Sequence, residues 1–241
     1  MNTVVIFAGG TGHRMNSKTV PKQFLELHGK PIIIYTLEQF ERHPLVDGIV
    51  VVCLKGWEAY LQKLLNRYFI EKVRAIVPGG ETGQESIYHG LKKLSELYSG
   101  DDIVLVHDGV RPLIDEDTIT ANIESVQLNG SAVTVAPCNE TVTTFDFDAP
   151  NQIEDIIERR HCKIAKAPQS FYLKELLAAH ERARKEGISD FIDSASMMRH
   201  YGHRLYTVDG QAANIKITTP MDFYIFRAIV DARENRQIMG F

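Results

Sequence analysis

The chain has 241 residues, of which 44% are hydrophobic and 24% charged, and its formal net charge at pH 7 is −4. These values are close to the globular average and exclude a wholly disordered chain, a collagen and a disulfide-built scaffold. The three cysteines, Cys53, Cys138 and Cys162, lie far apart and lack metal-ligand spacing. The negative net charge argues against non-specific nucleic-acid binding, so we expect no nucleic-acid partner.

The sequence predicts neither a membrane span nor a signal peptide. No apolar run approaches the ~20 residues that a membrane-spanning helix requires. The apolar run near the N-terminus passes straight into a glycine-rich loop and has no basic segment before it, which favours a strand. Because an odd number of scattered cysteines is typical of a reducing compartment, we expect a cytoplasmic protein.

Strands and helices alternate along the first half of the chain. Continuous apolar runs predict strands at residues 3–8, 48–54, 73–77, 102–107 and 132–136. Helical spacing of apolar residues predicts helices at residues 31–42, 57–69, 84–97 and 115–127, the last of them capped by Asp115. This alternation predicts an α/β fold, in which a mostly parallel, Rossmann-like sheet carries helices on both faces.

The alternation stops at residues 140–169. Residues 141–147 alternate like a hairpin strand, and residues 148–151 have the composition of a turn. We interpret the segment at about 139–166 as a protruding β-arm inserted into a single domain that spans residues 1–241. Further along the chain, the patterns predict helices at residues 172–186, 194–200 and 221–233 and short strands at residues 204–208 and 214–217.

The loop after the first strand combines glycines with cations. Ligands of parallel sheets bind at the carboxyl ends of the strands, and the glycines of this loop let backbone N–H groups approach a ligand closely. The loop matches neither the dinucleotide-binding fingerprint nor the P-loop motif, because it lacks residues that each motif requires. Two cations, Arg14 and Lys22, suit a triphosphate, because they can neutralise charge that develops during phosphoryl transfer. The alternative is a plain tight turn with both cations in solvent.

Five blocks in this order resemble one family. The segment AGGTGHRM…PKQF resembles the signature of cytidylyltransferases that activate 2-C-methyl-D-erythritol 4-phosphate or D-ribitol 5-phosphate. The further blocks are Gly79-Gly80…Ser86, HDGVRP at residues 107–112, Pro168-Gln169, and NIKIT at residues 214–218. The resemblance runs from about residue 4 to residue 222, nearly the whole chain.

The resemblance implies a reaction in which CTP and a polyol phosphate give a CDP-polyol and pyrophosphate, with Mg²⁺ bridging the phosphates. It implies that three cations act in catalysis, namely Arg14, Lys22 and Lys216. The residues implied in CTP binding are Ala8, Gly9, Gly10, Gly12, Gly80, Glu81 and Ser86. Without the resemblance, a helix N-terminal hydroxyl is the better explanation of Ser86.

The acceptor site is expected at the end of the fourth strand. There, Asp108 can accept hydrogen bonds from a polyol or help to hold Mg²⁺, and Arg111 can donate to the polyol or its phosphate. The resemblance implies that the arm crosses to a partner subunit in a homodimer. Thr141 would then touch the partner's acceptor, and Arg159 would bind its phosphate. The neighbouring cations Arg160 and Lys163 are alternatives to Arg159.

Several departures from the family pattern bear on the acceptor. Gly83 stands where the family commonly has arginine, and Ile192 stands where the methylerythritol branch has threonine. Ala213, the Gly9-Gly10 pair and the HDGVRP block depart from that branch as well, and together they favour D-ribitol 5-phosphate. Three alternatives stay open. They are the methylerythritol enzyme, a sugar-1-phosphate nucleotidyltransferase that uses another base, and a non-catalytic nucleotide-binding protein.

Overall fold

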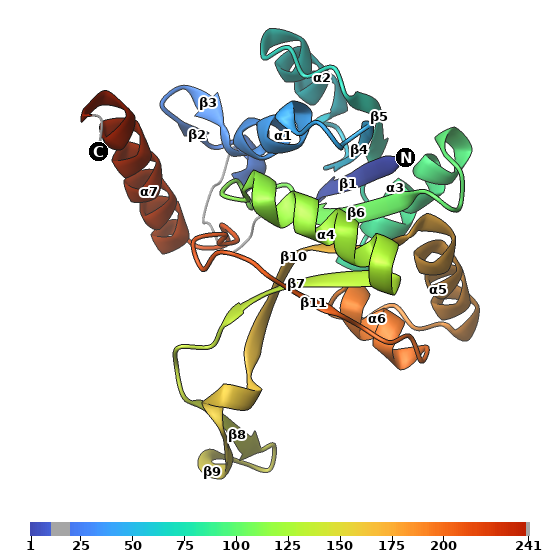
Figure 1. Ribbon diagram of the computed structural model, residues 1–241, viewed down its shortest axis with the longest axis vertical. Helices are drawn as coiled ribbons and strands as arrows, with labels where there is room; N and C mark the ends of the chain where they lie inside the picture. Colours follow the sequence, from blue (N-terminus) through green and yellow to red (C-terminus); the bar gives the residue numbers. More distant parts are fainter. Residues whose placement is uncertain (11–19, 240–241) are drawn as a thin grey trace.

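A seven-stranded sheet forms the centre of the molecule, with strand order β11-β7-β10-β6-β1-β4-β5. The computed structural model describes residues 1–10 and 20–239, with side chains to residue 235. Every strand of this sheet runs in one direction except β10, which is antiparallel to both of its neighbours (Figure 1). The strands are β1 (Asn2–Ala8), β4 (Gly48–Cys53), β5 (Val73–Pro78), β6 (Ile103–Asp108), β7 (Ser131–Pro137), β10 (Lys163–Tyr172) and β11 (Thr207–Asp209).

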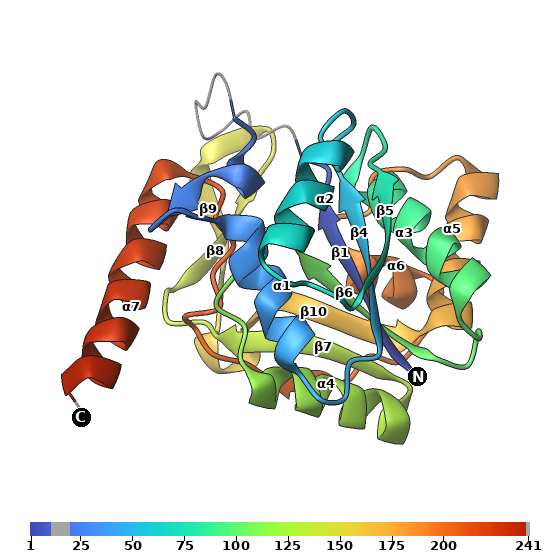
Figure 2. The ribbon, with the colours of Figure 1, turned by 90° about the horizontal axis from the view of Figure 1, so that it is seen from above.

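Helices cover both faces of this sheet (Figure 2). One face carries α1 (Ile32–Arg42), α2 (Glu58–Arg67) and α4 (Glu116–Asn129), and the other carries α3 (Gly83–Leu97), α5 (Leu173–Glu186) and α6 (Ser194–His200). Successive residues of a strand point to opposite faces, so Val4 and Ile6 pack in the first layer and Val5 packs in the second. This explains why β1 reads as a continuous apolar run, and it confirms the predicted fold class.

Helix α3 packs unusually close to the sheet. A Cβ atom built on Gly90 would lie 2.6 Å from Cγ1 of Val5 and 2.9 Å from Cγ2 of Val52. Glycine is therefore required at this position, because any larger residue would push the helix away from β1 and β4. The close contact holds the amino end of α3 near the carboxyl ends of those strands.

The last helix, α7 (Pro220–Met239), stands to one side of the sheet, as Figure 2 shows. It packs through Phe226 and Val230 against a small apolar cluster that includes Leu27 and Ile217. Leu27 belongs to a short hairpin formed by β2 (Glu26–Leu27) and β3 (Lys30–Pro31). Helix α7 thereby anchors the segment that carries Lys216.

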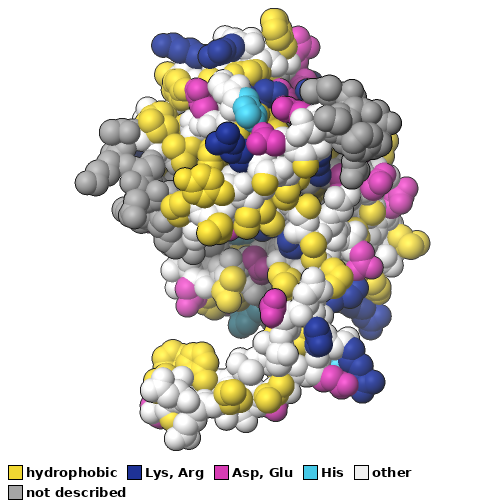
Figure 3. Space-filling view, turned by 90° about the vertical axis from the view of Figure 1, so that its left-hand side faces the viewer, with side chains coloured by type: hydrophobic (Ala, Val, Ile, Leu, Met, Phe, Trp, Pro, Cys, Tyr) yellow, Lys and Arg dark blue, Asp and Glu magenta, His cyan; other side chains and the backbone are white. Residues whose placement is uncertain are grey.

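The arm is a separate two-stranded hairpin that projects from the sheet (Figure 1). It consists of β8 (Val142–Asp146) and β9 (Ala149–Ile157), and a 3-10 turn at Arg159–His161 leads into β10. Figure 3 shows hydrophobic side chains gathered at its tip. Phe145 is 55% exposed and Phe147 is 92% exposed, so the arm has an uncovered apolar surface.

Some local predictions differ from the structure. The sequence predicts no strand at residues 163–172, where the structure has β10, and the turn of the arm lies at residues 147–148 rather than 148–151. The strand expected at residues 204–208 is formed by Thr207–Asp209. The strand expected at residues 214–217 is wrong, because this segment pairs with no strand and instead uses its polar groups for contacts at the site. No helix in the described part of the chain is long and apolar enough to cross a membrane.

Candidate active site

A cavity of about 420 Å³ opens at the carboxyl ends of β1, β5 and β6. It brings together most residues that the sequence assigned to the nucleotide and to catalysis. These are Ala8, Gly9, Gly10, Lys22, Gly80, Glu81, Ser86, Asp108 and Lys216. Gly12 and Arg14, also assigned there, lie outside the described residues.

A buried glutamine braces the loop after β1. The side-chain amide of Gln23 donates to the backbone oxygen of Ala8 at 2.7 Å, and Gln23 is only 1% exposed. Gln23 belongs to a short 3-10 turn, Lys22–Phe24, whose first residue lines the cavity. This contact fixes the turn that carries Lys22 to the end of β1. Sequence reasoning missed the role of Gln23, although it lies beside Lys22 in the PKQF block.

The second glycine segment is organised by Ser86 in the first turn of α3. Its buried hydroxyl accepts a hydrogen bond from the N–H of Gly80 at 3.1 Å. A Cβ atom on Gly9 would lie 3.1 Å from the same hydroxyl oxygen, so the two glycine segments meet at this side chain. The N–H of Glu81 donates to a carboxylate oxygen of Glu85 at 2.8 Å. Ser86 thus shapes the wall of the cavity, and its contact with a nucleotide stays a prediction.

Asp108, at the end of β6, is the electrostatic centre of the site. One carboxylate oxygen lies 2.6 Å from Nζ of Lys216, and the other accepts from Nε of Arg111 at 3.1 Å. Asp108 is 5% exposed, and burial alone would raise its pKa. The charges of Lys216 and Arg111 outweigh burial and hold the pKa of Asp108 below its usual value. Asp108 is therefore ionised at neutral pH, and it fixes both cations.

His107 precedes Asp108 and faces the interior. Burial lowers the pKa of His107 to about 4, although a ring nitrogen lies 3.0 Å from the backbone oxygen of Arg111. Its ring also packs edge-on against Phe40. The ring is therefore neutral at pH 7 and packed in the interior, and it is not placed to carry a proton.

The segment before α7 is tied to the site through Asn214. Its backbone oxygen accepts from Nη1 of Arg111 at 2.7 Å and from Nζ of Lys166 at 3.1 Å. Its side-chain amide donates to the backbone oxygen of Ala167 at 2.8 Å. These bonds connect β6, β10 and the segment that carries Lys216.

A second cavity of about 590 Å³ adjoins the first. Phe7, Asp108 and Lys216 line both cavities, so these residues lie at the border between them. Arg111 lines the second cavity together with two residues of β10 that sequence reasoning missed, Lys166 and Gln169. Lys166 carried no sequence signal, because its strand was not predicted, whereas Gln169 belongs to the quoted Pro168-Gln169 block.

The arm residues lie apart from both cavities of their own chain. Thr141 and Arg159 are exposed and line neither cavity. Nη1 of Arg159 donates to the backbone oxygen of Asn139 at 3.0 Å, at the base of the arm. Their predicted contacts with an acceptor would therefore need a partner subunit.

Asp108 does not have the surroundings of a metal ligand. Both of its oxygens are engaged by cations, and the other carboxylate lining the first cavity, Glu81, is exposed. Mg²⁺ prefers near-ideal octahedral oxygen coordination with carboxylates that are free to bind it. The residues described here therefore do not fit a protein-held Mg²⁺, and the metal role of Asp108 stays a prediction without geometric support.

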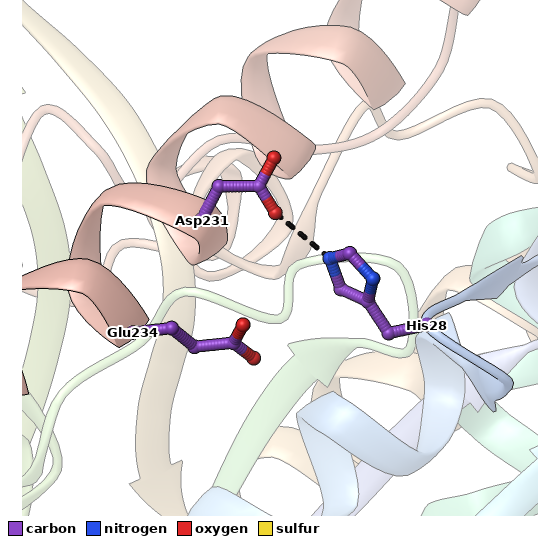
Figure 4. Close-up of side chains that lie close together, drawn as sticks. All are labelled: His28, Asp231 and Glu234. Carbon is purple, nitrogen blue, oxygen red and sulfur yellow. Dashed lines mark hydrogen bonds and ion pairs between the residues drawn. The ribbon is translucent and has the colours of Figure 1, made fainter. Parts of the chain in front are cut away.

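A second cluster of titratable groups lies away from both cavities, between the β2–β3 hairpin and α7 (Figure 4). A ring nitrogen of His28 lies 2.8 Å from Asp231, and the ligand atoms of His28, Asp231 and Glu234 lie within 4.8 Å of one another. His28 and Asp231 are 44% and 40% exposed, and Asp231 also faces Arg227 at 3.6 Å. This cluster joins the hairpin to the last helix and takes no part in the candidate active site.

Comparison with known proteins agrees with this geometry. Residues 2–232 match the family model described as "2-C-methyl-D-erythritol 4-phosphate cytidylyltransferase". The chain is 50% identical to a ribitol-5-phosphate cytidylyltransferase of Vibrio parahaemolyticus over 240 residues, which cover 100% of both chains. It is 51% identical to a ribitol-5-phosphate cytidylyltransferase of Streptococcus agalactiae serotype V, covering 100% of this chain and 99% of that one.

More distant relatives include enzymes of the methylerythritol branch. A 2-C-methyl-D-erythritol 4-phosphate cytidylyltransferase of Clostridium botulinum is 36% identical, covering 95% of this chain and 97% of that one. The crystal structure of a 4-diphosphocytidyl-2C-methyl-D-erythritol synthase from Anaerococcus prevotii superimposes with a TM-score of 0.82 at 26% identity, covering 95% and 96% of the two chains. With its fold, its cavity and its match over residues 2–232, the chain belongs to the 2-C-methyl-D-erythritol 4-phosphate cytidylyltransferase family of CTP-dependent nucleotidyltransferases.

Proposed function

We propose that the protein transfers CMP from CTP to D-ribitol 5-phosphate and releases pyrophosphate. The observation that carries this proposal is the convergence of Lys22 and Lys216 on a glycine-walled cavity at the end of β1. Full-length identity of about half to proteins named ribitol-5-phosphate cytidylyltransferases supports this acceptor. The identity to the methylerythritol enzymes is lower, at 36%.

In this reaction, a phosphate oxygen of the acceptor attacks the α-phosphorus of CTP. A new phosphorus–oxygen bond forms, the bond between the α-phosphorus and the bridging oxygen to the β-phosphate breaks, and pyrophosphate leaves with that oxygen. The protein supplies no covalent intermediate, so positioning and charge neutralisation carry the catalysis. Lys22 and Lys216, with Arg14, would stabilise the negative charge that builds on the phosphates.

Asp108 positions the ammonium group of Lys216 for this charge stabilisation. Because the ion pair is 2.6 Å long and Asp108 is buried, the ammonium group is held in place before substrate binds. Such preorganised cations cost no reorganisation during the reaction. The nucleotide would bring Mg²⁺ as its own counter-ion in the form of Mg·CTP, with the metal held by phosphate oxygens.

The acceptor would occupy the adjoining cavity. Arg111 lines it, and Asp108 and Lys216 lie at its border with the nucleotide cavity, where the two phosphates must meet. We further propose a homodimer in which Thr141 and Arg159 of each arm complete the partner's acceptor site. The exposed apolar surface of the arm supports this assembly, because such surfaces usually mark interfaces. The scattered free cysteines support a cytoplasmic location.

The decisive experiment measures pyrophosphate release from CTP against a panel of polyol phosphates. We expect the highest kcat/KM with D-ribitol 5-phosphate and strong preference for CTP over UTP and ATP. Comparable release with UTP or ATP at subsaturating nucleotide would refute the cytosine-specific assignment of the Gly79–Ser86 segment. Higher kcat/KM with 2-C-methyl-D-erythritol 4-phosphate would instead place the protein in the methylerythritol branch.

A further inference from the structure

Lys166 has no charged partner within the described ranges, residues 1–10 and 20–239. It lies in β10 and is half-buried, and no carboxylate oxygen of the described residues lies within 4.0 Å of its ammonium nitrogen. Nζ donates instead to two backbone oxygens, those of Ala212 at 3.0 Å and Asn214 at 3.1 Å. An ammonium group has three donors, so one remains available to a ligand.

The surroundings of Lys166 make its unpaired positive charge energetically unfavourable. Burial lowers the pKa of Lys166, and the nearby charge of Arg111 lowers it further. Both cations donate to one acceptor, the backbone oxygen of Asn214. A positive charge that is partly removed from water gains from a nearby anion, because its hydration is incomplete. An unpaired lysine beside an arginine therefore indicates an anion that binds there.

The charges around Asp108 are unbalanced in the same direction. Arg111 and Lys216 share the single carboxylate of Asp108, and Lys166 adds a third positive charge to the lining of the same cavity. These three cations are linked to one another through Asp108 and the backbone oxygen of Asn214, and this linked group contains one carboxylate, so it carries two excess positive charges. A phosphate monoester carries a charge of about −1.5 to −2 at neutral pH, which balances that excess.

Two further acids line this cavity without neutralising Lys166. Asp193 uses one oxygen to cap α6 through the N–H of Ser196 and the other to accept from Gln169, each at 2.8 Å. Asp190 is exposed to solvent. Neither forms an ion pair with Lys166, so the positive excess beside Arg111 persists.

We propose that Lys166 is a substrate-binding residue that donates to the phosphate of the acceptor from within the same chain. This inference deepens the proposed function and rests on it. The ammonium group would act with Arg111 and Lys216 at the border where the acceptor phosphate meets CTP. Residues of β6 and β10 of the same chain would then form one part of the phosphate site. A cation from a partner's arm could form the other part.

The test is the variant Lys166→Met, which keeps the length of the side chain and removes its charge. We expect KM for D-ribitol 5-phosphate to rise ~10–100-fold, the size expected for one charge-assisted hydrogen bond. The kcat value and KM for CTP should stay within about twofold of wild type, because the contact is made equally in the ground state and the transition state. Lys166→Arg should keep KM for the acceptor within about fivefold, since it restores a cationic donor.

Lys174→Met is the matched control. Lys174 is an exposed lysine of α5 that pairs with Asp101 and lines neither cavity of the site. Its substitution should leave all three kinetic constants unchanged. A loss of kcat in Lys166→Met with an unchanged KM for the acceptor would overturn the proposal, because Lys166 would then only hold the segment that carries Lys216. A rise in KM for CTP alone would overturn it as well.

Inorganic phosphate separates this proposal from the proposed function. If the wild-type protein turned over no polyol phosphate, the proposed function would fail, whereas the anion site could still be measured. Inorganic phosphate should raise the unfolding temperature of the wild-type protein and of Lys166→Arg, with a clearly smaller rise for Lys166→Met. An equal rise in all three proteins, or none in the wild type, would refute the role of Lys166.

Discussion

Asp108 at the end of β6 and Lys216 in the segment before α7 form an ion pair of 2.6 Å at the border of two cavities. The carboxylate is buried and ionised, whereas the lysine is 41% exposed and reaches the cavity that would hold the triphosphate. The buried carboxylate thereby holds the ammonium group of Lys216 at the border of the two cavities.

Asp108→Asn should lower kcat by about 10²–10³-fold, comparable with the loss of a preorganised stabilising group. The amide keeps the shape of the side chain but leaves Lys216 without its charged partner. Steady-state kinetics at saturating CTP will measure the effect, with circular dichroism as a check on folding. If Asp108→Asn retains more than about a tenth of wild-type kcat, short of that loss, the ion pair does not prepare the catalytic lysine.

Lys22→Ala should lower kcat by about 10²–10³-fold and leave the unfolding temperature nearly unchanged. Lys22 lines the nucleotide cavity at the start of a turn that Gln23 anchors to β1. A contact that strengthens in the transition state appears in kcat rather than in KM. Arg14→Ala, in the part of the loop outside the described residues, should behave in the same way. A small effect of both substitutions would mean that the loop cations remain in solvent.

His180→Leu should make the protein less sensitive to acid. His180 is 1% exposed, neither ring nitrogen has a hydrogen-bond partner among the described residues, and burial lowers its pKa to about 4. The unfolded chain binds a proton near pH 6.5, whereas the folded chain resists it, so His180 destabilises the fold as the pH falls from 6.5 toward 4. Denaturant unfolding at pH 7 and pH 4.5 should show about 2–3 kcal/mol less loss in the variant. An unchanged pH dependence would mean that the buried ring does not resist protonation.

Gly90→Ala should destabilise the fold by about 1–3 kcal/mol through overpacking. The added methyl group would lie 2.6 Å from Val5 and 2.9 Å from Val52. Gly83→Ala is the control at the start of the same helix, where a new Cβ meets no atom within 4 Å. That control should be neutral or slightly stabilising, because alanine favours helix more than glycine does. Equal unfolding free energies for the two variants would contradict the close packing of α3 on the sheet.

Phe147→Asp, with Phe145→Asp as a second variant, should weaken the proposed homodimer. Both rings are exposed on the arm and stack on each other with centroids 6.2 Å apart. A charge in that apolar surface is costly to bury between subunits. Light scattering should give a dimer for the wild type and monomers of 27.2 kDa for the variants, with reduced activity. A fully active wild-type monomer would refute the assembly.

Local sequence patterns were sufficient for the elements that make up the parallel part of the sheet. The runs at β1, β4 and β6 are apolar on both faces, because helices cover both faces of the sheet. Such strands can be predicted from their own residues alone. Strand β10 was missed because one end of it is exposed and the other is buried, so no single period describes it. The segment around Asn214 was misread as a strand because Ile215 and Ile217 alternate with polar residues that the site uses.

The sequence by itself determined the family, the glycine segments and the identity of Lys22, Asp108, Arg111 and Lys216, because these residues lie in short ordered blocks. Only the tertiary structure decided which groups meet. The antiparallel return of β10 places Lys166 beside Arg111 on the backbone oxygen of Asn214. The spacing of apolar residues along the chain cannot predict this contact between Lys166, Arg111 and Asn214. It depends on bringing together segments that lie far apart in the sequence and on how far each charge is removed from water.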